Sequence, residues 1–363
     1  MSSAREAEKA AFLAAAGLAD ARRERLAGDA STRAYERLHP ASGPSFILMD
    51  QPPAAETQPC PPNATAAERQ ALGYNALARL AAGRVDAFIA AAGYLTSRGL
   101  SAPKIIASDA GRGFAVLEDL GDNLYATLIA EGADEGPLYD AAIDALVLLH
   151  AERPPAELKT DGAVWPLLTY DNLALKTAQD LFTEWTPKLR PQVAFDADAL
   201  AEWEAIWAPI RARGEAGASV FCHRDYHAEN LIWLPERAGP ARVGLLDFQD
   251  AVLAHPVWDL SMLLHDARRE VSAERERACL ERYLRARPEV DADAFLADYR
   301  ALGALNVFRI LGIFARLVTR DNKPKYEAFL PRLWRYVDRC IAEPGLEELG
   351  LWLERYVPEG TRG

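Results

Sequence analysis

The chain has 363 residues, half of them hydrophobic, and a formal net charge of −12. This length suits two lobes and this apolar content excludes a disordered chain. The acidic balance disfavours binding of nucleic acid, which needs a basic surface, and the absence of a run of about 18 apolar residues argues against a membrane span. Four scattered Cys without CxxC spacing are typical of a protein in a reducing cytoplasm. We also expect the protein to be a monomer.

The N-terminal residues 1–20 alternate charged and apolar positions, which predicts an amphipathic helix rather than a signal peptide. Residues 34–50, AYERLHPASGPSFILMD, predict a hairpin because two β-favouring runs flank a Pro-Gly-Ser turn. The proline-rich residues 51–65 exclude helix and central strand. Thr65 then stands three residues before Glu68, which is the spacing of a capping box at the start of a helix.

The next stretch alternates helix and strand signals. An apolar face over residues 85–95 predicts a helix. PKIIASD (103–109) and GFAVLEDL (113–120) predict two paired strands. Beyond them the chain is predicted to be mainly helical, apart from two short apolar strands around a Pro-Gly turn in residues 230–248.

Strands therefore gather early in the chain and helices late. We expect an α+β fold with two lobes. The small N-terminal lobe, residues 1–120, would hold an antiparallel sheet, and the larger C-terminal lobe, residues 121–363, would be mainly helical, with a hinge near residues 118–122.

The richest stretch in polar residues is FCHRDYHAEN, residues 221–230. His223 and His227 are four residues apart, as in some zinc sites, but no HExxH pattern is present and the other His are far off in the sequence. Zinc is therefore disfavoured. Asn230 follows Asp225 by five residues, which is the spacing of the kinase loop H-R-D-x-x-x-x-N, where one loop holds a base and a metal ligand.

Two further blocks follow this loop in order. In LLDFQD, Asp247 follows an apolar strand, where a metal-binding carboxylate is expected in a kinase, although a strand-end turn would also use Asp. In HPVWDLSMLL, Asp259 begins an apolar helix, where a structural role is favoured. The three sequence blocks in this order indicate a kinase far more specifically than any one block does.

These blocks resemble the aminoglycoside-phosphotransferase branch of the kinase-like fold. Within that branch, GDASTRAYERL, ILMDQPP, GLSAPKI, VLEDLGDNLY, DFQDAV and LGIFARL resemble the anomeric kinases of cell-wall recycling, over residues 28–317. Those kinases phosphorylate C1 of N-acetylmuramate and N-acetylglucosamine. The resemblance implies a protein-kinase-like bilobal fold, a small amino sugar as partner, and the use of ATP and Mg²⁺.

The resemblance also implies roles by position. Asp225 would be the catalytic base and contact the acceptor, and Asn230 and Asp247 would bind Mg²⁺. The nucleotide would contact two segments, the hinge and the GDASTR loop. The residues implied there are Glu118, Leu120, Ser31, Thr32 and Arg33.

One departure concerns the strand lysine that grips the phosphates in typical kinases. The corresponding strand reads FILMD, with Met49 or Asp50 where the lysine is expected. Arg33 and Arg37 are candidate replacements because a guanidinium binds phosphate in a bidentate manner. A surface role for each arginine remains open at this point.

The acceptor site is less marked in the sequence. Residues 300–339 hold nine Lys or Arg against three acidic residues, which favours an anionic acceptor over a cationic one, although most of these charges would lie on a solvated helix face. Candidate acceptor residues are Asp250, Arg268 and Arg309, and Asp250 would equally serve to hold its loop. Two alternatives remain: a kinase of this fold with another acceptor (an aminoglycoside, choline or another metabolite), and a non-catalytic ATP-binding scaffold.

Overall fold

The computed structural model describes residues 3–26, 33–52 and 58–362. Its N-terminal part is a five-stranded sheet in the order β1-β2-β3-β5-β4, with all neighbours antiparallel. The strands are β1 (Arg22–Arg25), β2 (Ala34–His39), β3 (Phe46–Asp50), β4 (Ile105–Asp109) and β5 (Phe114–Glu118). The predicted hairpin over residues 34–50 is confirmed as β2 and β3, and the predicted pair at 103–120 as β4 and β5.

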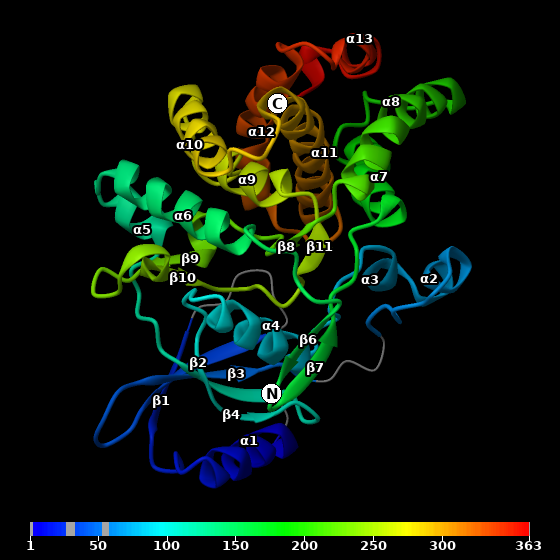
Figure 1. Ribbon diagram of the computed structural model, residues 1–363. Coiled ribbons are helices and arrows are strands. Elements are labelled where there is room, and N and C mark those ends of the chain that lie inside the picture. Colours follow the sequence, from blue (N-terminus) through cyan, green and yellow to red (C-terminus); the bar gives the residue numbers. More distant parts are fainter. Residues whose placement is uncertain (1–2, 27–32, 53–57, 363) are drawn as a thin grey trace.

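Helices cover both faces of this sheet, α1 (Ser3–Ala15) on one and α4 (Val85–Ser97) on the other (Figure 1). Because side chains alternate along a strand, Leu48 on β3 packs with α1 in one hydrophobic cluster, whereas its neighbour Met49 packs in the main core on the opposite side. Phe12 of α1 stacks on Phe114 of β5, with ring centroids 5.4 Å apart. The predicted helices at the N-terminus and at 85–95 are thereby confirmed.

The connection between β3 and α4 contains the short helices α2 (Ala66–Leu72) and α3 (Tyr74–Leu77). Thr65 and Glu68 form the predicted capping box, in which each side chain binds the backbone of the other residue. A hairpin that the sequence did not reveal, β6 (Glu157–Thr160) and β7 (Ala163–Pro166), packs against α4. Gly93 permits this approach, since a Cβ there would lie 2.1 Å from Thr160 Cγ2.

The rest of the chain is mainly helical, as predicted, with short strands near the sheet (Figure 1). The helices are α5 (Tyr125–Ala130), α6 (Glu135–Leu149), α7 (Asn172–Leu189), α8 (Ala197–Ala216), α9 (Val257–Leu264), α10 (Ala273–Ala286), α11 (Ala292–Thr319), α12 (Leu330–Ile341) and α13 (Glu347–Tyr356), with the 3₁₀ turns η1 (Ala228–Asn230), η2 (Gly239–Arg242), η3 (Pro324–Phe329) and η4 (Glu359–Thr361). The predicted strands in 230–248 are β9 (Leu231–Trp233) and β10 (Val243–Leu245), and a further pair joins β8 (Val220–Cys222) to β11 (Val252–Ala254).

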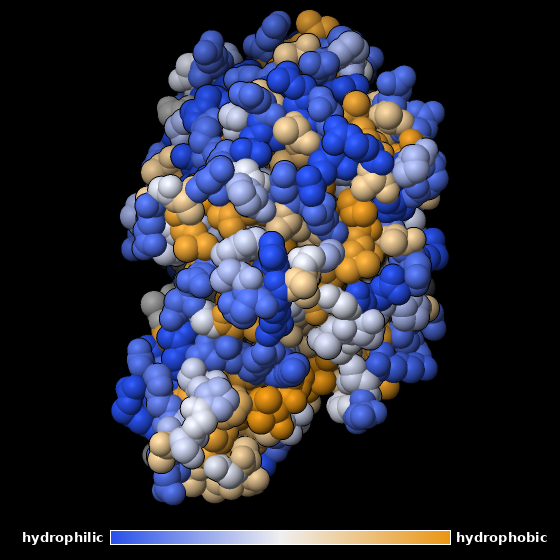
Figure 2. Space-filling model, turned by 60° about the vertical axis from the view of Figure 1, so that its left-hand side comes forward, coloured by the Kyte–Doolittle hydropathy of each residue, from blue (hydrophilic) through white to orange (hydrophobic). Residues whose placement is uncertain are grey.

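Helix α11 is the central helix of this part. By length and composition it is the one helix in the described part of the chain that could cross a membrane, but 78% of its apolar window is buried inside the protein. Gly312 lets α11 approach α7, since a Cβ there would lie 2.3 Å from the backbone carbonyl carbon of Leu181. On the face shown in Figure 2, hydrophilic residues predominate and apolar residues form separate patches. Because most of the apolar residues of α11 are buried, they form part of the protein core.

Candidate active site

A cleft of about 870 Å³ separates the sheet from the C-terminal helices. Its walls come from β2, the segment between β5 and α5, the loop between β8 and β9, the segment after β10, the end of α9, and α11 with η3. Many of its residues are polar or charged. Those include Arg33, Tyr35, Arg37, Asp119, Asp122, Asp225, His227, Glu229, Asn230, Asp247, Asp266, Arg268, Arg309 and Lys325.

The loop after β8 is fixed by the buried carboxylate of Asp259 on α9. Asp259 accepts hydrogen bonds from the backbone N–H of His223 (2.7 Å) and of Arg224 (2.8 Å). Burial raises the pKa of Asp259 above its usual value. The structural role expected for Asp259 is therefore seen directly.

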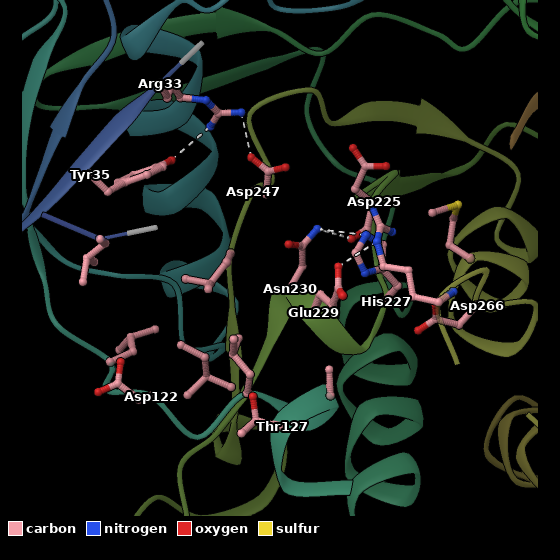
Figure 3. Close-up of a pocket in the computed structure, with 18 of the residues that line it drawn as sticks. Arg33, Tyr35, Asp122, Thr127, Asp225, His227, Glu229, Asn230, Asp247 and Asp266 are labelled. Carbon is pink, nitrogen blue, oxygen red and sulfur yellow. Dashed lines mark hydrogen bonds and ion pairs between the residues drawn. The ribbon is translucent and has the colours of Figure 1, made fainter. Parts of the chain in front are cut away.

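Arg224 braces the same loop against the segment after α3. Its Nη2 donates to the carbonyl of Ala78 at 2.8 Å, and its guanidinium lies 4.7 Å from the centre of the Tyr170 ring. Its backbone φ of +78° lies in the left-handed region, which non-glycine residues rarely adopt. The next residue, Asp225, lines the cleft (Figure 3).

Asn230 and Asp247 come together as the sequence predicted. A backbone hydrogen bond of 3.0 Å from Leu246 N to the carbonyl of Asn230 holds their two segments side by side. The side-chain nitrogen of Asn230 donates to the carbonyl of Asp225 at 2.9 Å, so the amide oxygen is the end that is turned toward Asp247 (Figure 3). A carboxylate and an amide oxygen in one cleft suit a hard cation such as Mg²⁺.

His227 lies between these groups and the wall formed by α9. Burial lowers the pKa of His227 to about 4, so its imidazole is neutral near pH 7. Its Nε2 lies 3.3 Å from the side-chain nitrogen of Asn230. A neutral ring at this position supports the orientation of the Asn230 amide without adding a positive charge.

Arg33 extends from the residue before β2 to Asp247. Its Nη2 lies 2.7 Å from Asp247 Oδ1 (Figure 3), and its Nη1 donates to Gln249 Oε1 at 2.6 Å. Desolvation in the cleft acts to raise the pKa of Asp247, but the charge of Arg33 and the hydrogen bond from Gln249, with smaller contributions, together bring the pKa below its usual value. Arg33 thus brings a positive charge to the carboxylate that the sequence assigned to metal binding.

Met49 and Asp50, which stand where a typical kinase has its strand lysine, face opposite sides of the sheet. Met49 faces the cleft side of the sheet, where Tyr35 Oη lies 3.8 Å from its sulfur. Asp50 faces the other side and pairs with Lys9 of α1 at 3.0 Å. Arg37, the second candidate, pairs with Asp119 at 2.7 Å and so lies toward the segment between β5 and α5.

The segment between β5 and α5 forms another wall of the cleft. The Glu118 side chain accepts hydrogen bonds from Arg237 (2.7 Å) and from the backbone of Lys104 (3.2 Å). The nucleotide contact expected of Glu118 is a contact of its backbone and does not involve this side chain. Leu120 packs with Ile232 on β9. Ser31 and Thr32, also predicted to contact nucleotide, lie outside the described residues.

The three candidate acceptor residues differ in position. Arg268 and Arg309 both line the cleft, and Arg268 pairs with Glu229 at 2.7 Å. Asp250 accepts a hydrogen bond of 2.6 Å from the backbone of Ala81, and the described residues that line the cleft do not include it. Its contacts suit the loop-holding alternative, and its role in acceptor binding stays a prediction.

Comparison with known proteins decides the family. The model of the phosphotransferase enzyme family matches residues 22–299. This chain belongs to that phosphotransferase family. The N-acetylmuramate/N-acetylglucosamine kinase of Caulobacter vibrioides is 71% identical over 362 residues, covering 100% of this chain and 99% of that protein. A kinase of the same name from Pseudomonas aeruginosa is 30% identical, covering 92% of this chain and 88% of that protein.

Solved structures confirm the protein-kinase-like fold of this phosphotransferase. A choline/ethanolamine kinase family protein from Mesorhizobium loti superposes with a TM-score of 0.56 at 16% identity, covering 96% of this chain and 98% of that one. An ADP-bound aminoglycoside phosphotransferase superposes with a TM-score of 0.53 at 13% identity, covering 94% and 99%.

Several charged residues in the cleft of this phosphotransferase were not predicted from the sequence, among them Asp122, Glu229, Asp266 and Lys325. Asp266, just beyond the C-terminal end of α9, is only 2% exposed and lines the cleft next to His227 (Figure 3). No motif marks it. The signal available was an acidic residue directly after an apolar helix, HPVWDLSMLLHDA, where burial of a carboxylate is costly unless a partner or ligand is provided.

Proposed function

We propose that this phosphotransferase is an ATP-dependent sugar kinase. It transfers the γ-phosphoryl group of ATP to the anomeric C1 hydroxyl of N-acetylmuramate and N-acetylglucosamine, a reaction of peptidoglycan recycling. The observation that carries this proposal is the 71% identity, over essentially the whole chain, to a kinase named for these two sugars. The cleft supports the proposal, because Asp225, Asn230 and Asp247 all line it.

In this mechanism Asp225 orients the anomeric hydroxyl and accepts its proton. An anomeric hydroxyl is more acidic than an ordinary sugar hydroxyl, so a carboxylate is a sufficient base. The backbone bonds from His223 and Arg224 to Asp259 keep the loop in place, which reduces the cost of aligning base and acceptor.

The phosphates of ATP would bind at the end of the cleft that contains Asn230, Asp247 and Arg33. Asn230 and Asp247 would hold Mg²⁺, which neutralises phosphate charge when bound. Arg33 supplies a guanidinium at the same carboxylate and would contact the nucleotide phosphates. The backbones of Glu118 and Leu120 would bind adenine, and Ser31 and Thr32 would cover the nucleotide.

The proposal extends to the setting of the enzyme. We place it in the cytoplasm as a monomer that binds no nucleic acid and no membrane, with one lobe over residues 1–120 and the other over residues 121–363. All four Cys are buried and free, which suits a reducing compartment. Light scattering of the purified protein tests whether it is a monomer in solution.

A substrate panel tests the function. ADP release should be measured with N-acetylmuramate, N-acetylglucosamine, kanamycin and choline as separate acceptors, at saturating ATP and Mg²⁺. We expect rapid turnover with both amino sugars and only background release with the other two. Turnover with kanamycin or choline above that with both sugars would refute the proposal.

A further inference from the structure

Arg309 stands out among the basic residues of the cleft because of its partners. The side chain extends from α11, and the residue is only 8% exposed. Its polar partners among the described residues are Asn306 Oδ1 at 2.9 Å and Met262 Sδ at 3.3 Å, and the Trp258 ring lies 5.7 Å away. None of these groups is an anion.

A buried guanidinium without an anionic partner is unfavourable, because its charge has lost most of its water. Arg268, which also lines the cleft, is neutralised by Glu229 at 2.7 Å. Asn306 fixes Arg309 further, since its side-chain nitrogen donates to Met262 Sδ at 3.0 Å while its oxygen accepts from Arg309. Arg309 is therefore held in one orientation with its charge left for a ligand.

Asp266 is a buried acidic residue in the same cleft, and one of its carboxylate oxygens lacks a partner among the described residues. Its Oδ1 accepts a hydrogen bond of 2.9 Å from the backbone of Arg268. Its Oδ2 is buried and has no hydrogen-bond partner among the described residues. Buried polar atoms are nearly always paired, so an oxygen left over in a ligand cleft indicates that a ligand donor completes it.

Asp266 lies at the end of the cleft that holds the proposed base, and Arg309 is linked to the helix that precedes Asp266. Figure 3 shows Asp266 gathered with His227 and Asp225, whereas Arg33 and Tyr35 lie at the other end with Asp247. Arg309 donates to Met262 on α9, the helix that Asp266 follows. A molecule placed with its reacting hydroxyl at Asp225 would thus extend toward α9 and α11.

We propose that Arg309 and Asp266 form a divided acceptor subsite, in which Arg309 binds the lactyl carboxylate of N-acetylmuramate and Asp266 accepts a hydrogen bond from a sugar hydroxyl or amide. This inference rests on the proposed function and deepens it. N-acetylglucosamine lacks the lactyl group, so it uses Asp266 and leaves Arg309 without a carboxylate. One site thereby serves an anionic and a neutral sugar.

The first test removes the charge of Arg309. For Arg309→Met, we expect kcat/KM for N-acetylmuramate to fall about 10- to 100-fold, mostly through KM, as for loss of a charge-assisted hydrogen bond. The value for N-acetylglucosamine should change by less than about threefold. Equal losses for both sugars, or no loss for N-acetylmuramate, would overturn the role of Arg309.

Arg316→Met is the matched control. Arg316 lies seven residues further along α11 with its guanidinium 5.0 Å from the centre of the Tyr74 ring, and it is not among the described residues that line the cleft. It should leave the ratio of the two kcat/KM values unchanged. A shift of this ratio as large as that of Arg309→Met would mean that charge anywhere on α11, and not contact with the carboxylate, sets the preference.

A second measurement leaves the protein intact and so does not depend on folding of a variant. Wild-type enzyme is assayed with the neutral lactamide analogue of N-acetylmuramate, in which an amide replaces the carboxylate. We expect kcat/KM for the lactamide to fall at least about tenfold below that for N-acetylmuramate. A lactamide as good as the acid would overturn the carboxylate subsite while leaving the kinase activity itself established.

Asp266→Asn tests the other half of the subsite. The amide keeps the shape of the side chain but weakens its capacity to accept hydrogen bonds. KM should rise about tenfold for both sugars, while KM for ATP stays within about twofold of wild type. A change confined to ATP, or no change, would remove Asp266 from the acceptor site. If wild-type protein phosphorylates neither sugar, it is the proposed function that fails.

Discussion

At the scale of single residues, strained backbone occurs in the cleft and in the loop that carries Asp225. Arg224 and Asp247 have φ of +78° and +62°, in the left-handed region. Such conformations cost about 1–3 kcal/mol each and persist only where the surroundings enforce them. Here Asp259 fixes the first segment, and the bond from Leu246 to Asn230 fixes the second. The strain is borne by the residue before the proposed base and by a proposed metal ligand.

Asp225→Asn tests the base directly. The amide has nearly the same shape but cannot accept the proton of the acceptor hydroxyl, so kcat should fall by about 10²–10⁴-fold. Binding of ATP, measured by calorimetry, should stay within about twofold of wild type because the nucleotide contacts are proposed elsewhere in the cleft. Near-normal turnover in a correctly folded variant would exclude Asp225 as the base.

Arg33 is expected to replace the strand lysine. For Arg33→Met, we expect KM for ATP to rise about tenfold or more, since a charge-assisted contact to phosphate is lost. Met49→Lys introduced into that variant returns a cation to β3 on the cleft side and should recover part of the loss. Arg37→Met serves as control, because Arg37 pairs with Asp119 away from Asp247. An unchanged KM for ATP in Arg33→Met would contradict the assignment.

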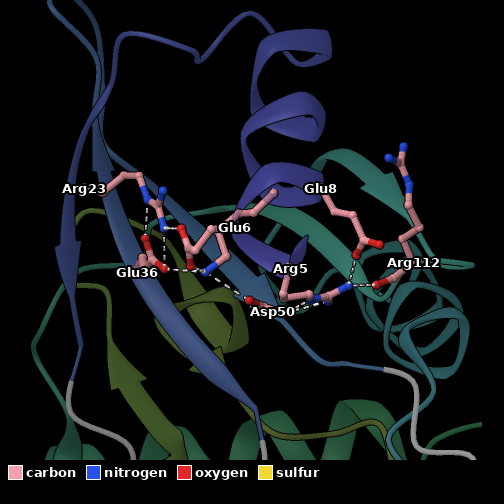
Figure 4. A network of polar contacts seen from close by, with 8 residues as sticks. Arg5, Glu6, Glu8, Arg23, Glu36, Asp50 and Arg112 are labelled. Carbon is pink, nitrogen blue, oxygen red and sulfur yellow. Dashed lines mark hydrogen bonds and ion pairs between the residues drawn. The ribbon is translucent and has the colours of Figure 1, made fainter. Parts of the chain in front are cut away.

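At the scale of elements, α1 is fastened to the sheet by a buried ion network (Figure 4). Lys9 is fully buried, and its Nζ lies 2.8 Å from Glu36 on β2 and 3.0 Å from Asp50 on β3. Burial lowers the pKa of Lys9, but these carboxylates outweigh it and keep the pKa above its usual value. Arg5 adds a second cation to Asp50 at 2.6 Å. Asp50, at the end of β3, thus serves the docking of α1.

Lys9→Met should therefore destabilise the protein. It leaves two carboxylates with less compensation, and we expect the free energy of unfolding to fall by about 3 kcal/mol. Combining it with Asp50→Asn should cost less than the sum of the single changes, because the two residues interact. Urea unfolding measures both. Lys188→Met, which removes a half-exposed pair with Glu184, is the control and should cost less than about 1 kcal/mol.

The sequence predicts elements well where their pattern is regular. The hairpin of β2 and β3, the capping box at Thr65 and the apolar face of α4 follow from local rules. The β6–β7 hairpin was missed because its first strand, ELKT, contains a single apolar residue and so shows no apolar pattern. Its Asp161-Gly162 turn is the signal that would have found it, since Asp-Gly is a preferred two-residue hairpin turn.

The same contrast holds for the site. Asp225, Asn230 and Asp247 could be predicted because one loop and one strand end fix their spacing. The acceptor wall could not be resolved in the same way. Helix α11 is buried on nearly every side, so its period does not show which face meets the cleft. That Arg309 turns into the cleft, while Arg316 does not line it, depends on how α9, α7 and η3 pack around α11.

At the scale of the whole molecule, we propose a sheet that binds nucleotide and helices that bind the acceptor, with the catalytic loop between them. The proposed reaction is transfer of the phosphoryl group to the anomeric hydroxyl. The fold alone does not identify the acceptor, because a choline/ethanolamine kinase family protein and an aminoglycoside phosphotransferase have a similar fold. The position of the phosphate on the product therefore discriminates best.

The decisive measurement is phosphorus NMR of the product formed from N-acetylglucosamine and from N-acetylmuramate with ATP and Mg²⁺. We predict a phosphate coupled to the anomeric proton for both sugars, and no product from the 1,5-anhydro analogue of N-acetylglucosamine, which lacks the anomeric hydroxyl. Phosphate on another hydroxyl, or turnover of the anhydro sugar at the normal rate, would contradict this prediction.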